Sequence, residues 1–266
     1  MRANFKLILA ITTATCALAA VVTGAHLTSS NTMPGLNLSL WKGLHRGIST
    51  AAAIGAIALA FTVTGQLRAW LAGSVLFAAL PGGLLEAKTA AGIAGIAHAI
   101  SASVMTSVCA VAALQLSWRG AAATVPDEGS PSLKALARAT WIGLLIQTAL
   151  GALFRHQFLG LLPHVAGAML VMGMVMYAGI AAFSTENAPA AVKRPALTLL
   201  IMTGVQMLIG LGAYLYRIEF REQATGQAAM LTFTVMHVAV GALTTACSAL
   251  MGMQISRYVR TGAVAQ

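Results

Sequence analysis

The chain has 266 residues, of which 58% are hydrophobic and only 8% are Asp, Glu, Lys or Arg, against roughly 25% charged residues in an ordinary soluble domain. This composition excludes a soluble enzyme and a disordered chain. The formal net charge of +10 indicates no nucleic-acid partner, because the basic residues are scattered between long apolar runs and form no basic face. We therefore predict an integral, polytopic, all-α membrane protein in contact with lipid.

Eight segments are candidates for membrane-spanning helices, because a spanning helix needs about 20 mostly apolar residues. In chain order they are residues 7–24, 47–65, 70–85, 93–116, 139–153, 165–183, 197–215 and 231–253. The third and fifth segments are short, and Pro81 is predicted to kink or end the third.

The connections between these segments predict the orientation. With the N-terminus inside, ten Lys and Arg residues lie in inner segments and six in outer ones. An inside excess favours cytoplasmic N- and C-termini in the inner membrane, which requires an even number of spans. The alternative is that the first segment is a cleavable signal peptide, which would leave seven spans.

The longest polar connection, residues 118–137, divides the chain into two halves. We predict an N-terminal four-helix bundle over residues 1–120, a cytoplasmic linker over 121–137, and a C-terminal four-helix bundle over 138–266. Both halves start on the inner side, so we expect a pseudo-two-fold axis along the membrane normal.

Histidine recurs in the two halves at comparable places, since each even-numbered segment is predicted to begin with one. These residues are His45, His98, His164 and His237. A histidine in a span is costly and by default indicates a functional site. Without thiols or carboxylates nearby for a zinc or di-iron site, facing imidazoles suit the two axial positions of a haem iron.

Two arginines and two further histidines near the predicted outer face of the membrane each allow two interpretations. Arg46 and Arg155 either pair with haem propionates or reach toward lipid headgroups. We expect His26 and His156 to be solvated or to lie beside the ligands. Two glutamines, each followed four residues later by glycine, are explained by hydrogen bonds between helices. The three cysteines all fall in apolar segments and imply no disulfide or metal framework.

At this point the chain resembles the heme A synthase family, the cytochrome oxidase assembly proteins that convert haem O to haem A. The resemblance covers essentially the whole chain. The matching pieces are His45-Arg46, the stretch from Gln147 to His156, Gln206 to Gly210, His98, His164 with Gly167-Ala168, and His237.

This resemblance implies eight helices in two pseudo-symmetric bundles. It places His45 and His98 beside haem O as substrate, in a catalytic role, and His164 and His237 as ligands of a haem b cofactor. The implied reaction oxidises the C8 methyl group of haem O to a formyl group. The implied partners are haem O synthase or cytochrome oxidase subunits.

The sequence departs from the family in two places. The first outer loop lacks the cysteine pair found in many members, and Lys42 stands three residues before His45, where the family has a glutamate. A protonated lysine cannot stabilise a developing cation or accept a proton as a carboxylate does. The alternative hypothesis is therefore a non-catalytic bis-histidine haem b protein for electron transfer or oxidase assembly.

Overall fold

The computed structural model describes residues 2–30, 37–86, 91–219 and 224–261. The described residues form eight helices and one pair of short strands. The helices are α1 (Arg2–Ser30), α2 (Leu38–Thr62), α3 (Gly65–Glu86), α4 (Ala91–Ser117), α5 (Leu133–Arg155), α6 (Leu161–Ser184), α7 (Ala190–Glu219) and α8 (Ala224–Tyr258); the strands are β1 (Val125–Asp127) and β2 (Val259–Thr261).

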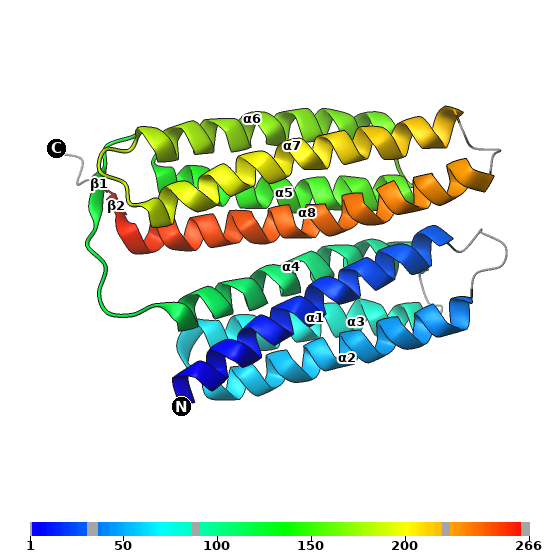
Figure 1. The fold of residues 1–266 in the computed structure, drawn as a ribbon, viewed down its shortest axis with the longest axis horizontal. Coiled ribbons are helices and arrows are strands. Elements are labelled where there is room, and N and C mark those ends of the chain that lie inside the picture. The colour runs from blue at the N-terminus through cyan, green and yellow to red at the C-terminus, as the bar shows by residue number, and fades with distance from the viewer. Residues whose placement is uncertain (1, 31–36, 87–90, 220–223, 262–266) are drawn as a thin grey trace.

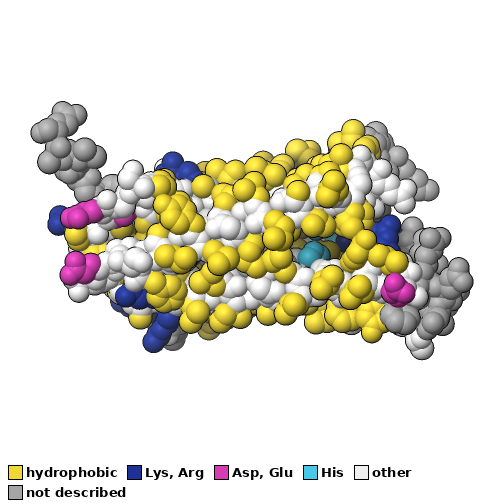
Figure 2. Space-filling model, turned by 90° about the horizontal axis from the view of Figure 1, so that it is seen from above, with side chains coloured by type: hydrophobic (Ala, Val, Ile, Leu, Met, Phe, Trp, Pro, Cys, Tyr) yellow, Lys and Arg dark blue, Asp and Glu magenta, His cyan; other side chains and the backbone are white. Residues whose placement is uncertain are grey.

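All eight helices are long and apolar enough to cross a membrane, as the sequence predicts. Large apolar side chains such as Phe61 and Leu162 are 81% and 78% exposed, which is the expected condition of residues that face lipid. Figure 2 shows hydrophobic side chains covering the middle of the molecule, with charged side chains gathered toward its ends.

Several helices extend beyond the predicted segments. Helix α2 begins at Leu38, where the side chain of Asn37 accepts a hydrogen bond from the backbone of Leu40, and α5 begins after Ser132, which caps it in the same way. Such caps satisfy backbone N–H groups that the first turn leaves without partners. Pro81 does not end the third helix, since α3 continues to Glu86.

The second predicted segment, residues 47–65, extends past the C-terminal end of the observed helix. Helix α2 stops at Thr62, Val63 is extended, and Gly65 starts α3 with a φ of +64°. Glycine adopts this left-handed conformation without steric cost. The connection between α2 and α3 is therefore shorter than the sequence predicted.

The buried apolar residues form two clusters, one drawn from each end of the sequence. The first cluster lies between residues 10 and 112 and includes Leu59, Leu71 and Cys109. The second lies between residues 133 and 259 and includes Leu199 and Met251. Figure 1 shows α1–α4 on one side of the molecule and α5–α8 on the other. Cys109 is fully buried, and all three cysteines are free.

The segment that connects α4 to α5 is hydrogen-bonded to the end of α8 and to the strand that follows it. Strand β1 pairs in parallel with β2, with Val125 opposite Val259. Arg257 in α8 donates hydrogen bonds to the carbonyls of Arg119 and Gly120. In Figure 1 the start of α1 and the end of α8 lie at the same end of the molecule.

Candidate functional site

The four histidines of the even-numbered helices lie in two pairs. The ring centroids of His45 in α2 and His98 in α4 are 6.1 Å apart, and the ring planes are inclined by 84°. The centroids of His164 in α6 and His237 in α8 are also 6.1 Å apart, with an inclination of 80°. The structure therefore brings together the residues that the sequence singled out, and it does so with matching geometry.

The prediction that each of these histidines begins its helix is wrong. His45 and His98 lie two turns into α2 and α4, His164 lies one turn into α6, and His237 lies well inside the long α8. The first turns of α4 and α8 are rich in small or polar residues and fell outside the apolar segments, whereas α6 begins with Leu161, Leu162 and Pro163. All four imidazoles are half-buried.

The spacing of each pair fits a single metal ion between two imidazoles. A bond from a metal to an imidazole nitrogen is about 2 Å long, so the ring centres of two axial ligands are roughly 6 Å apart. Two nitrogens do not complete the coordination sphere of a metal ion, so other ligands would have to supply the remaining positions; a porphyrin would supply four. Within the described part of the chain no cluster of three His, Cys, Asp or Glu side chains could hold a metal by itself.

A glycine on the preceding helix lies against each imidazole. A Cβ atom placed on Gly24, Gly82, Gly151 or Gly210 would lie 3.0, 3.4, 3.0 or 2.8 Å from Cε1 of His45, His98, His164 or His237, respectively. Contacts at or below about 3.0 Å force a shift of the ring. The glycines therefore allow each imidazole to pack directly against a neighbouring backbone.

The two glutamines of α5 and α7 contact the histidines of α6 and α8. The amide nitrogen of Gln147 lies 3.0 Å from Nδ1 of His164 and donates to its backbone carbonyl at 2.9 Å. The amide nitrogen of Gln206 lies 3.3 Å from Nε2 of His237, whose Nδ1 lies 3.1 Å from the Gln206 carbonyl. These are helix-to-helix hydrogen bonds, as predicted, but the sequence did not reveal that histidine is the partner.

The pair in the first half has different neighbours. The hydroxyl of Thr23 in α1 lies 3.1 Å from Nδ1 of His45. One turn further along α1, His26 stacks on Trp41 of α2 with a centroid separation of 3.9 Å. His26 therefore packs on α2, against a residue one turn before His45.

Arg155 contacts the other half of the chain. Its guanidinium donates to the carbonyl of Ala25 at 2.8 Å and to the hydroxyl of Ser29, both in α1. Arg46 and Lys42 are exposed on α2. The sequence could not distinguish these positions, because a basic residue near a helix end suits propionates, carbonyls and headgroups alike.

The turn after α5 also contacts the first half. A Cβ on Gly95 would lie 2.5 Å from Cε1 of His156, and one on Gly92 would lie 2.7 Å from Cε2 of Phe158, so both rings fill notches in α4. Partial burial, and secondarily the Arg155 guanidinium, lower the pKa of His156 from its usual value. His156 is therefore a packing residue that favours the neutral form.

An aromatic and cationic group lies next to His164. The ring of Phe154 is nearly parallel to that of His164, at 6.4 Å and 6°, and the Arg217 guanidinium lies 5.1 Å from the Phe154 centroid. Phe154 and Arg217 line an open groove of about 440 Å³ with Leu161, Tyr214 and Ile218. In Figure 2 a histidine is visible between hydrophobic side chains, with a Lys or Arg beside it.

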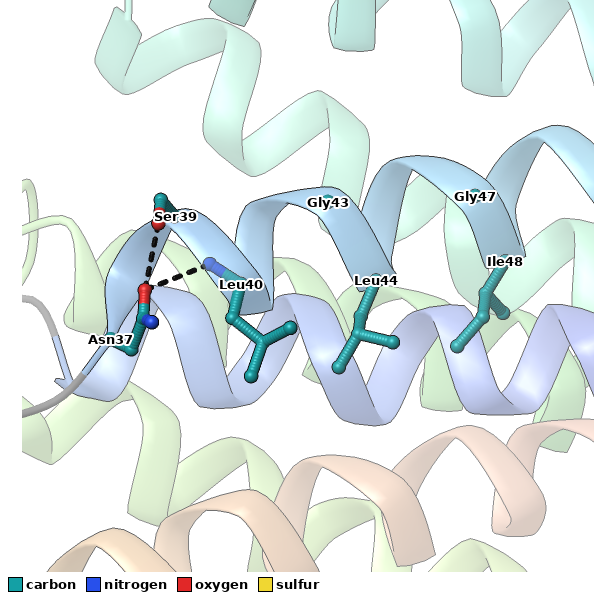
Figure 3. Close-up of a pocket in the computed structure, with 7 residues that line it drawn as sticks. All are labelled: Asn37, Ser39, Leu40, Gly43, Leu44, Gly47 and Ile48. Carbon is teal, nitrogen blue, oxygen red and sulfur yellow. Dashed lines mark hydrogen bonds between the residues drawn. The ribbon is translucent and has the colours of Figure 1, made fainter.

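A larger open groove, of about 620 Å³, runs along α2 (Figure 3). Its lining residues are Asn37, Ser39, Leu40, Gly43, Leu44, Gly47 and Ile48. They all come from the start of one helix, and none is a member of the histidine pairs. The groove is a surface feature of α2 and contributes no ligand to the site.

Neither protein-family models nor curated proteins give a match to this chain.

Proposed function

We propose that each histidine pair binds one haem, and that the pairs belong to two pseudo-symmetric four-helix bundles formed by residues 1–120 and 138–266. The observation that carries this proposal is the equal spacing of the two pairs, 6.1 Å between ring centroids in both. Four glycines that admit the imidazoles at matching places support the same conclusion.

Within this proposal, His164 and His237 hold haem b as a cofactor, and His45 and His98 hold haem O as a substrate. Bound haem b would supply a one-electron redox centre in an apolar surrounding. The protein residues would orient the imidazoles, and Arg46 would neutralise a propionate, whereas the Arg155 guanidinium is bonded to Ala25 and Ser29 of α1. The proposed reaction is the oxidation of the C8 methyl group of haem O to a formyl group, as in heme A synthase. The methyl group and one water give the formyl group, four protons and four electrons, and the electrons leave to an external electron acceptor.

The protein would act in the inner membrane with both termini in the cytoplasm. The haem sites then lie toward the periplasmic side, because the even-numbered helices begin there. Haem O synthase, which makes the substrate, and cytochrome oxidase subunits, which receive the product, are the expected partners.

One observation favours a second candidate function. Lys42 is exposed one turn before His45, where the resembling family has a glutamate, and an ammonium group does not replace a carboxylate as a proton acceptor. A haem b protein for electron transfer or oxidase assembly would need both histidine pairs and no carboxylate at this position.

The test is co-expression with a source of haem O, followed by extraction and identification of the pigments. We expect haem A in the membranes that contain the wild-type protein and none with His45→Ala. A well-expressed protein that carries only haem B and haem O would overturn the synthase proposal and favour the second candidate.

A pyridine haemochrome spectrum of the purified protein tests what the two candidates share. We expect His164→Ala to remove the haem of the C-terminal half and to leave the other in place. A wild-type protein that binds no haem would overturn both candidates.

A further inference from the structure

The open groove at the end of α5 and α7 combines a cationic side chain with apolar walls. Its lining residues are Phe154 from the last turn of α5, Leu161 from the start of α6, and Tyr214, Arg217 and Ile218 from the last turns of α7. The volume of about 440 Å³ lies within the usual range of ligand sites. Three helices therefore build this groove, whereas the groove along α2 comes from one helix alone.

Arg217 supplies the positive charge of this groove. Its guanidinium lies 5.1 Å from the centre of the Phe154 ring, and a guanidinium over an aromatic face can still donate hydrogen bonds from the N–H groups at its rim. Glu219 is two residues further along α7 and so faces a different side of this helix. Among the described lining residues the groove thus presents a cation and no carboxylate, which suits an anionic ligand.

An apolar track leads from the groove toward the middle of α7. The track consists of Leu208, Leu211, Leu215 and Ile218, whose spacings of three, four and three residues place them on one face of the helix. All four side chains are exposed. Since a helix rises about 1.5 Å per residue, the track is roughly 15 Å long, which matches about half of the hydrocarbon thickness of a bilayer. Its length therefore fits an acyl chain of one leaflet.

We propose that this groove binds one anionic phospholipid, with the phosphate at Arg217 and the Tyr214 hydroxyl and one acyl chain along the α7 track. Arginine can pair with a phosphate through two parallel hydrogen bonds, and tyrosine suits the level of the headgroups because its side chain is apolar with a polar tip. A second copy of this chain is a poor occupant, since it carries 16 basic residues and only 6 acidic ones. Lipid binding at this place requires no haem in the protein.

The first experiment titrates the purified, delipidated protein in detergent with phosphatidylglycerol, and native mass spectrometry counts the bound lipid. Arg194→Gln is the matched control for Arg217→Gln, because Arg194 is exposed near the other end of the same helix. We expect the tightest phosphatidylglycerol site to weaken roughly tenfold in Arg217→Gln, as for the loss of one hydrogen bond to a charged group, and to stay unchanged in the control. Equal affinities in Arg217→Gln and the wild type would overturn the proposal.

A zwitterionic lipid and a conservative variant test the role of charge. We expect the wild type to bind phosphatidylcholine with the same acyl chains more weakly than phosphatidylglycerol, because the choline group cancels the charge of the phosphate. Arg217→Lys should retain part of the binding, since it keeps the charge and loses the two-point contact. Equal affinity for the two lipids, or equal binding by Arg217→Lys and Arg217→Gln, would contradict a site for an anionic headgroup.

Photo-crosslinking locates the bound lipid. The protein is reconstituted in phosphatidylcholine vesicles that contain a small fraction of phosphatidylglycerol with a photoreactive acyl chain. We expect adducts on the α7 track, and their loss in Arg217→Gln but not in Arg194→Gln. Adducts spread evenly over all lipid-facing helices would show that lipid touches α7 without a site there, and would overturn the proposal.

Two other occupants of the groove would give different results. Inorganic phosphate should compete poorly with phosphatidylglycerol, because it has no acyl chain, and full displacement by it would reveal a site for a free anion. A dimeric wild type that becomes monomeric in Arg217→Gln would assign the groove to a second copy of this chain. Either result would overturn lipid binding.

Discussion

The imidazoles pack against glycines of the preceding helices, where any side chain would be in their way. Gly210 shows this most sharply, because a Cβ there would lie 2.8 Å from Cε1 and 3.0 Å from Nδ1 of His237. The imidazole cannot move back without losing its contacts to Gln206. The glycine is therefore part of the site although it carries no chemical group.

We predict that Gly210→Ala displaces the His237 ring and lowers the haem content of the purified protein, at a cost of about 1–3 kcal/mol from overpacking. The haem-to-protein ratio and the melting temperature in detergent measure the two effects. Gly204→Ala on the same helix is the control, since nothing lies within 4 Å of a Cβ at that position. Equal haem loss in both variants would contradict the prediction.

His156 gives a prediction about pH. Its pKa is lowered in the folded protein by burial and by Arg155, below the usual 6.5, so the unfolded chain binds more protons between these two values. Stability is then complete above about 6.5 and falls as the pH drops through the folded-state pKa. Protonation would loosen the contact with Gly95 in α4.

We therefore expect the melting temperature in detergent to fall less steeply between pH 7 and pH 5 for His156→Gln than for the wild type. Parallel curves would show that another group governs the acid response. At pH 7 the two proteins should differ only by the packing lost with the ring.

At the level of single residues, the sequence predicted the four histidines as candidate ligands but not the side chains that contact them. Four histidines at similar places in four apolar segments are visible without a structure. The contacts from Gln147 to His164 and from Thr23 to His45 depend on the rotation of each helix about its axis, which the apolar pattern does not fix when a helix is hydrophobic all round.

At the level of whole helices, α1 and α2 pack together through a close approach of their backbones. Gly55 in α2 lies against Thr13 in α1, and a Cβ on this glycine would overlap the threonine hydroxyl. Ala10, Ala17 and Ala56 are buried in the surrounding cluster. Small residues at such crossings are the usual means by which membrane helices associate.

We predict that Gly55→Leu separates α1 from α2 and costs about 1–3 kcal/mol, with a lower melting temperature and reduced haem content in the N-terminal half, since Thr23 and His45 would move apart. Gly73→Leu on α3 should have little effect, because nothing lies within 4 Å of a Cβ there. A stable Gly55→Leu protein would argue against this helix crossing.

The number and order of the helices could be predicted because each is a long apolar run. Their ends could not, since Asn37 and Ser132 extend α2 and α5 by capping, and these first turns contain too many polar residues to score as membrane segments. This error mattered for the site, because it placed the histidines at the helix starts instead of inside them.

For the whole molecule, the positive charges predict which end faces the cytoplasm. We expect cysteines introduced at Arg68 or Lys193, in a protein without native cysteines, to react with a membrane-impermeant reagent only after the membrane is opened. Cysteines at Lys42 or Arg217 should react in intact spheroplasts. The reverse pattern would invert the topology and move the proposed haem sites to the cytoplasmic side.

The contacts between the two groups of helices were beyond the reach of the sequence. Arg155 bonds α1 more than a hundred residues away, and Phe158 and His156 fill notches at Gly92 and Gly95 in α4. Nothing in the local pattern of either partner indicates the other, because such pairings depend on the tertiary arrangement alone.

The pairing of β1 with β2 also determines where the polypeptide can be divided. Since Val125–Asp127 hydrogen-bonds to Val259–Thr261, the first strand belongs structurally to the last four helices. A break at residues 121–124 would leave both strands on one fragment, whereas a break after Asp127 would put them on separate chains. Reconstitution from two co-expressed pieces should therefore succeed best with the earlier junction.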